Sequence, residues 1–309
     1  MKDIFISVNL ADAINRGFAQ IVQQYAEQFH KASTWLLFWL LNPIDHWLQA
    51  TPPLVLLFSL GLLTWLGTRR LGTSLAMVGL TYAIGCLGLW DKLMSTVSIM
   101  LVSVLVTVLI GIPLGIAMAK SSKLRRVLNP TLDMMQTLPS FVYLIPVLML
   151  FGLGRVPAIF ATTVYALPPL MRLTELGLRQ LPEDVLEASQ AFGATSFQQL
   201  FSVELPLARP SIMAGLNQAV MMSLAMVVIA SMIGARGLGE DVLSSINNLD
   251  MGQGLQAGLA IVMLAMVFDR VTQAYGRSRR ERLRSAKGGA QRRSRSSSIG
   301  TEERQEANV

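Results

Sequence analysis

Residues 182–206, PEDVLEASQAFGATSFQQLFSVELP, form a polar, turn-rich segment between two long apolar runs. Pro182 suits the first turn of a helix, because its missing N–H would have no intrahelical partner there. Glu183 and Asp184 then fall at the positive end of the helix dipole. Gly193 is placed to end that helix in the left-handed conformation. These signals predict a helix, a glycine turn and a second short helix.

The second half of the segment supplies start and stop signals of its own. Ser196 and Gln199 have the spacing of a capping box, and Leu205-Pro206 is expected to end the second helix. The result is a hairpin lying across one face of the membrane. Ala188 and Ser189 are small enough for a partner groove to close over them. Glu187 can accept charge-assisted hydrogen bonds.

The composition is that of a membrane protein. Apolar residues make up 52% of the 309 and charged residues 15%, whereas a soluble domain carries roughly 25% charge. The sequence contains no P-loop, HExxH or GxSxG motif, so we expect no enzyme activity and no nucleotide or metal site in this chain. The single cysteine, Cys86, excludes an intramolecular disulfide and is expected to be buried.

Seven apolar runs approach the roughly 20 residues that a membrane-crossing helix needs. They are residues 52–67, 71–90, 93–119, 140–153, 156–173, 210–233 and 255–275. Lys and Arg concentrate in cytoplasmic loops, and with the N-terminus outside most of the 26 basic residues become cytoplasmic. The sequence therefore predicts an all-α polytopic membrane protein, N-out and C-in.

The two ends of the chain differ from the spans. Residues 1–50 are predicted to be extracytoplasmic, with an amphipathic helix on the membrane surface. An aromatic run follows and is expected to stop at Asn42-Pro43, with Trp35, Trp39 and Trp47 at headgroup depth. The tail at 276–309 is predicted to be disordered and to contact anionic lipid through its ten Lys and Arg residues. We expect no nucleic-acid partner.

The spacing in residues 182–206 resembles the EAA signature of permease subunits of ATP-binding-cassette importers. That signature has Glu-Ala-Ala, a glycine six positions after the glutamate, and a hydrophobic-x-Leu-Pro ending. Ser189 and Val203 replace the usual alanine and isoleucine, while Glu187, Gly193 and Leu205-Pro206 keep their offsets.

The resemblance extends over about residues 93–275. The runs LPSFVYLIPVLMLFGLG and NQAVMMSLAMVVIASMIGARGLGEDV look like the permease of glycine betaine/proline importers. This implies a type I importer transmembrane domain with a five-helix core at 93–275, two accessory spans within 51–92 and a coupling loop at 180–207. It also implies import of glycine betaine, proline betaine or a related quaternary amine across the bacterial inner membrane, for osmoprotection.

The resemblance also implies partners. They are a second copy of this chain, two ATPase subunits that hold ATP and Mg, and an extracytoplasmic substrate-binding protein; this chain itself binds no cofactor. The residues expected to couple to the ATPase are Glu187, Ala188, Ser189, Phe192, Gly193, Leu205 and Pro206.

A few polar or aromatic side chains in the spans are candidates for the translocation path. Phe141 and Tyr143 offer π faces to a quaternary ammonium group. Asn217, Gln218 and Ser223 either line the path or bond between helices. Two glycine motifs have structural interpretations: Gly111 and Gly115 form a small-xxx-small step, and residues 234–239 are either an outer gate or a helix C-cap with a turn.

Other functions remain open from the sequence alone. The substrate is alternatively choline, carnitine or another small amino-acid-like solute. A stand-alone secondary transporter or an osmotically gated channel is a different class, and a scaffold that only anchors an ATPase is a third. Apart from Asp269-Arg270, the core spans carry almost no charge. This argues against the buried acidic relay of an ion-coupled transporter.

Overall fold

The computed structural model describes residues 10–276, and all regular structure within that range is helical. The first half contains α1 (Leu10–Leu36), η1 (Leu37–Leu41), α2 (Asn42–Ala50), α3 (Pro53–Thr68), α4 (Leu71–Cys86), α5 (Trp90–Lys120), α6 (Ser122–Thr137) and α7 (Ser140–Phe151). The second half contains α8 (Arg155–Arg179), α9 (Glu183–Ala191), α10 (Ser196–Gln199), η2 (Leu200–Glu204), α11 (Leu205–Ile229), η3 (Ala230–Ile233), α12 (Leu238–Asn248) and α13 (Met251–Gly276). Elements η1 and η2 are π-helical turns, and η3 is a 3-10 helix.

Each of the seven predicted spans falls on a helix, but the helices differ in length. Four stretches are long and apolar enough to cross a membrane alone: α5, α8, the run Ser196–Ile233 and α13. Two bent pairs raise the number to at most six among the described residues; these are Glu27–Ala50 with α3, bent by 106°, and α6 with α7, bent by 103°. Helix α4 is apolar but has only 16 residues, about 24 Å of helix.

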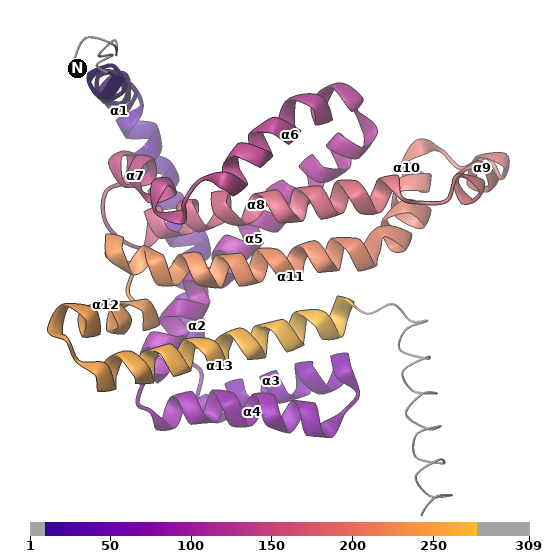
Figure 1. Cartoon of the computed structure of the whole chain (residues 1–309). Coiled ribbons are helices and arrows are strands. Elements are labelled where there is room, and N and C mark those ends of the chain that lie inside the picture. The colour runs from indigo at the N-terminus through magenta and orange to yellow at the C-terminus, as the bar shows by residue number, and fades with distance from the viewer. Residues whose placement is uncertain (1–9, 277–309) are drawn as a thin grey trace, which may run out of the picture.

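Helix α8 forms the centre of the bundle and packs between α5 and α11 (Figure 1). A Cβ on Gly115 of α5 would lie 2.7 Å from Thr174 Cβ of α8. On the other side, a Cβ on Gly177 of α8 would lie 2.5 Å from Ser211 Cβ of α11. Glycines therefore let three helices approach closely. The close contact expected from Gly111 and Gly115 is confirmed.

The accessory helices lie at the edge of the bundle. Helices α3 and α4 form an antiparallel pair that packs on α13 (Figure 1). The pair turns at Arg69, which has a φ of +52°. The Tyr275 hydroxyl of α13 donates to the Leu63 carbonyl of α3 at 3.1 Å. Cys86, at the end of α4, is exposed rather than buried, so that expectation is wrong.

The N-terminal helix does not end at Asn42-Pro43, contrary to the prediction. It runs through the π turn η1 directly into α2. The N–H of Asn42 bonds to the Leu37 carbonyl five residues back. In an α-helix the ring of Pro43 would clash with the carbonyl four residues earlier, and the wider π turn leaves room for it. Residues 1–9 and the basic tail at 277–309 lie outside the described residues, as do the predictions made for them.

Candidate functional site

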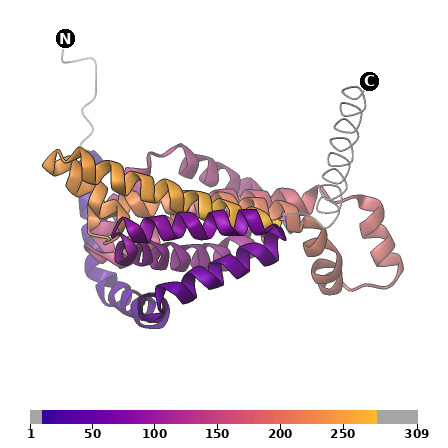
Figure 2. The ribbon, with the colours of Figure 1, turned by 90° about the horizontal axis from the view of Figure 1, so that it is seen from below.

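The segment predicted to form a hairpin does so and projects beyond the ends of α8 and α11. Figures 1 and 2 show α9 and α10 standing clear of the bundle at the end where α13 finishes. Pro182 is the N-cap of α9, one residue before the first turn where it was predicted, and Glu183 and Asp184 occupy that turn, as predicted. Gly193 has a φ of +79°, and its N–H bonds to the Gln190 carbonyl at 2.8 Å. The glycine turn is therefore formed as the sequence indicates.

The capping box of the second helix lies one residue earlier than predicted. Thr195 Oγ1 accepts from the Gln198 N–H at 3.4 Å, and Gln198 Oε1 accepts from the Thr195 N–H at 3.0 Å. Ser196 and Gln199 do not form the box. Gln199 is buried and its side-chain oxygen accepts from Gln190 at 3.4 Å, which joins α10 to α9.

Leu205-Pro206 does not end the second helix, so that prediction is wrong. The N–H of Leu205 bonds to the Leu200 carbonyl five residues back, forming the π turn η2, which continues into α11. As at Pro43, the widened turn accommodates the Pro206 ring. The hairpin is thus joined to the long helix α11 by continuous helical backbone.

The surface of the hairpin is unusually apolar for a segment outside the bundle. Phe192 is 92% exposed, Phe197 71% and Phe201 53%, and the rings of Phe197 and Phe201 lie 4.5 Å apart. We call these three exposed side chains of the hairpin the phenylalanine patch; Phe197 and Phe201 are in ring contact, and Phe192 lies at the end of α9. Clustered exposed apolar side chains rimmed by polar residues mark interaction sites.

The other predicted coupling residues lie on α9 or at the start of α11. Glu187 and Ala188 are exposed on α9, and Pro206 is exposed at the start of α11. Ser189 is half-buried, and its hydroxyl donates to the Leu186 carbonyl at 2.8 Å, so it is used within the helix. Leu205 is half-buried.

Two buried carboxylates at the base of the hairpin were not anticipated from the sequence. Glu204, in η2, is 4% exposed and forms an ion pair with Lys120 at the end of α5, at 2.7 Å. Glu175 of α8 pairs with Arg179 at 3.2 Å and lies 3.7 Å from Arg125 of α6. The sequence does show that Glu204 lies inside the apolar string Val-Glu-Leu, which indicates a buried carboxylate. Nothing in the local sequence identifies its partner, Lys120, which is 84 residues away.

The candidate path residues differ in their exposure and in the contacts that they make. Phe141 is exposed on α7, whereas Tyr143 is buried and donates its hydroxyl to the Met135 carbonyl. Gln218 is exposed on α11, and Ser223 is fully buried with no hydrogen-bond partner for its hydroxyl among the described residues. Their role in the path stays a prediction.

Asn217 bonds between helices. Its amide donates to Asp269 of α13 at 3.2 Å, and its side-chain oxygen accepts from the Thr272 hydroxyl. Gln273 donates to the same Asp269 carboxylate at 2.6 Å. The carboxylate in the last span is therefore held by neutral donors between α11 and α13.

Polar contacts also hold the opposite end of the bundle together. Gly234, with a φ of +84°, caps η3, so residues 234–237 form a C-cap and turn that leads into the unpredicted helix α12. The Leu238 N–H donates to Thr96 Oγ1 of α5 at 2.9 Å. The buried Asp241 of α12 pairs with Lys92 of α5 and accepts from Gln253 of α13 at 3.1 Å.

The N-terminal region is fixed to this same end. Asp45 of α2 forms an ion pair with Arg155 of α8 at 2.6 Å and accepts from the Ser98 hydroxyl of α5 at 2.9 Å. The rings of Phe29 and Phe151 pack edge to face with centroids 5.4 Å apart. The N-terminal region is therefore bound to the core through Phe29 and Asp45.

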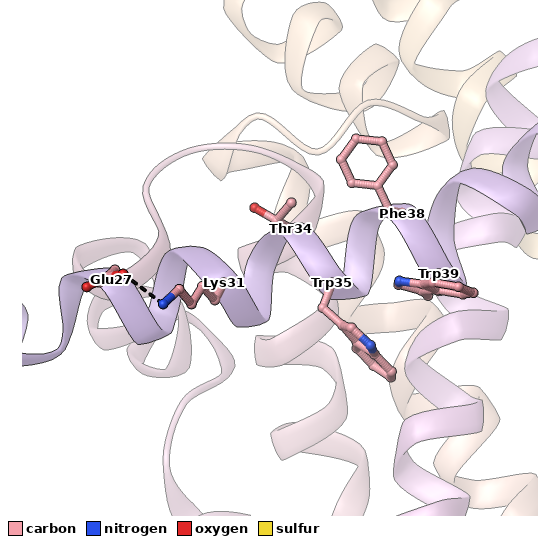
Figure 3. A pocket seen from close by; sticks show the side chains of 6 residues that line it. All are labelled: Glu27, Lys31, Thr34, Trp35, Phe38 and Trp39. Atoms are coloured by element: carbon pink, nitrogen blue, oxygen red, sulfur yellow. Dashed lines mark ion pairs between the residues drawn. The ribbon is translucent and has the colours of Figure 1, made fainter.

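An open pocket of about 490 Å³ lies along the N-terminal helix (Figure 3) and is lined by Glu27, Lys31, Thr34, Trp35, Phe38 and Trp39. An aromatic cage for a quaternary ammonium needs rings that converge on one point. Phe38 and Trp35 point to opposite sides of the helix in Figure 3, and Glu27 is paired with Lys31 at 2.7 Å. The pocket does not form such a cage.

The geometry defines a helical membrane protein with an exposed hairpin that projects from one end of the bundle, and sequence comparison places it in a family. Residues 111–281 match the binding-protein-dependent transport system inner membrane component family, and the chain belongs to that family. It is the permease subunit of an importer and an inner-membrane protein. The boundaries predicted between its regions stay a prediction.

Individual relatives narrow the comparison. The chain is 46% identical to the glycine betaine/proline betaine transport system permease protein ProW of Escherichia coli (strain K12) over 244 residues, 79% of this chain and 69% of that protein. It is 40% identical to the glycine betaine transport system permease protein OpuAB of Bacillus subtilis (strain 168) over 266 residues, 86% of this chain and 94% of that protein.

A solved structure confirms the fold. An inward-facing form of the MetNI methionine ABC transporter (CY5 native crystal form) superimposes with a TM-score of 0.54 at 24% identity, covering 61% of this chain and 96% of that chain. The predicted fold class, that of a type I importer transmembrane domain, is confirmed.

Proposed function

We propose that this permease translocates glycine betaine, proline betaine or a related quaternary amine, that a binding protein delivers the substrate from outside, and that the process serves osmoprotection. The names of the two relatives above support this substrate class. The membrane helices support it too, because the Asp269 carboxylate is already bonded to Asn217 and Gln273. A zwitterion with no net charge needs no additional buried counter-ion along its route.

Energy for transport comes from a separate ATPase that docks on the hairpin. The observation that carries this proposal is the phenylalanine patch, which stands clear of the bundle on a glycine-capped hairpin continuous with α11. Burying these rings in a partner groove supplies binding energy, and the exposed Glu187 on α9 supplies a charge-assisted contact. We infer two copies of this chain and two ATPase subunits, with ATP and Mg held by the ATPase.

The test is reconstitution of this chain with its ATPase and binding protein in lipid vesicles. We expect ATP-dependent uptake of labelled glycine betaine that requires all three proteins, with unlabelled choline and carnitine as competitors. Stronger competition by choline or carnitine than by unlabelled glycine betaine would assign one of these solutes instead. Uptake without the ATPase would contradict the importer and favour a stand-alone transporter.

A double variant of the hairpin tests whether the ATPase docks there. Glu187→Ala with Gly193→Val removes the exposed carboxylate and forces a β-branched residue into a φ of +79°. We expect this double variant to insert into the membrane but to lose the ATPase during purification. Glu183→Ala, on the first turn of the same helix, is the matched control. Normal uptake by the double variant would contradict the docking role.

A further inference from the structure

The base of the hairpin contains an ion pair to a helix that is not its neighbour in the chain. The hairpin continues from α8 on one side and into α11 on the other. Glu204 adds a third attachment, because its carboxylate meets Lys120 at the end of α5 at 2.7 Å. Helices α5 and α11 both flank the central helix α8, so this pair joins the hairpin to both sides of the core.

The surroundings make this pair hard to separate. Glu204 is 4% exposed, so its charge is removed from water and depends on Lys120 for compensation. Leaving a buried carboxylate without its partner is strongly unfavourable. Lys120 itself is half-exposed. Its long side chain can therefore remain paired while the two helix ends move slightly.

The pair sits at a point where the helix geometry changes. Glu204 is the last residue of the π turn η2, and π turns recur at functional positions in helices. A force on the hairpin would flex the chain at this turn unless something else held it. The ion pair to α5 provides that restraint.

We propose that Glu204 and Lys120 form the positioning pair that transmits movement of the hairpin to α5, so that α5 and α11 move together when the ATPase acts. This inference rests on the proposed docking of an ATPase to the hairpin. The effect of the pair is on how much transport each ATP supports.

The test compares ATP hydrolysis and glycine betaine uptake in the same vesicles containing the complete complex. In Lys120→Met we expect the ATPase to remain bound and to hydrolyse ATP, while uptake per ATP falls by about fivefold or more, the range typical of a lost coupling interaction. Glu204→Gln should act in the same direction. Lys120→Arg keeps the charge and should retain a wild-type ratio. The exchange Lys120→Glu with Glu204→Lys should recover part of the loss.

Glu175→Gln is the matched control, because Glu175 is also a buried, paired carboxylate at this end but bonds to α6 and α8. It should leave the ratio of uptake to hydrolysis unchanged. An unchanged ratio in Lys120→Met would overturn the proposal. So would loss of the assembled complex in Lys120→Met but not in Glu175→Gln, because the pair would then only maintain structure. Failure of the wild-type chain to bind an ATPase would instead overturn the proposed function.

Discussion

Adding a methyl group to Gly115 tests whether the close approach of α5 and α8 stabilises the bundle. The new Cβ would lie 2.7 Å from Thr174 Cβ and 2.9 Å from both Thr174 Cγ2 and the Met171 carbonyl oxygen. Carbon atoms in contact are normally about 3.5–4.0 Å apart. Thr174 Cβ and the Met171 carbonyl are fixed to the backbone of α8 and cannot rotate away. The two helices must therefore separate locally by about 1 Å.

The size of the effect follows from two opposing terms. Overpacking of a close contact costs about 1–3 kcal/mol. Replacing a glycine by alanine within a helix raises the free energy of unfolding by about 1 kcal/mol, because alanine has the higher helix propensity. We therefore expect Gly115→Ala to lower the free energy of unfolding by up to about 2 kcal/mol. Gly258→Ala on α13 is the control: its Cβ has no atom within 4 Å, so only the favourable term applies.

The assay is thermal unfolding of the purified chain in detergent, followed by circular dichroism at one fixed heating rate because such unfolding is often irreversible. The apparent midpoint should fall for Gly115→Ala and should stay level or rise for Gly258→Ala. A Gly115→Ala midpoint at or above that of the wild type would refute the reasoning.

Three further predictions concern other contacts. Thr96→Val keeps the side-chain volume but leaves the buried Leu238 N–H without its acceptor. It should lower the free energy of unfolding by about 1–3 kcal/mol, whereas Thr96→Ser, which keeps the hydroxyl, should retain most of the wild-type stability. The same unfolding midpoints measure both variants. Asp45→Asn removes the charge that pairs with Arg155; limited proteolysis should then cut the N-terminal helix faster, and equal rates would argue against the attachment. Phe192→Ala should weaken ATPase binding by about 2 kcal/mol, roughly 30-fold, if the ring is fully buried on docking, and an unchanged Kd would place the patch outside the interface.

The parts of the fold that the sequence predicts are those set by local composition. Long uncharged runs became helices because a membrane chain must satisfy its backbone groups internally. Gly193 ended α9 because few other residues adopt a φ of +79° without strain. The close contact at Gly115 was predictable because only small residues allow helices to approach so nearly.

The errors also have local causes. The string Thr195-Ser-Phe-Gln-Gln199 contains two overlapping capping boxes, one starting at each hydroxyl residue. The earlier one forms, and in it Gln199 is free to turn inward to Gln190. Sequence spacing alone does not distinguish the two, since the choice depends on contact with the preceding helix.

The long-range ion pairs could not be predicted from the sequence. Lys92 and Asp241 are separated by 149 residues, and Lys120 and Glu204 by 84. Lys92 and Lys120 look like ordinary charges at the two ends of an apolar run, and neither Asp241 nor Glu204 has a local partner in the sequence. Only the packing of α5 against the second half of the chain brings the partners together.

The π turn η2 has a geometric consequence for the direction in which the hairpin faces. The turn accommodates one residue more than an α-helical turn would, and each residue of an α-helix rotates the chain by about 100°. Deleting one residue from Leu200–Glu204 would return the ladder to α-helical bonding and swing the phenylalanine patch about a quarter-turn around the axis of α11. The proline at 206 makes that shorter form costly, because its ring would again meet a carbonyl four residues back. The one additional residue in η2 therefore sets the direction in which the docking surface faces around the axis of α11, and Pro206 disfavours the shorter turn that would change that direction.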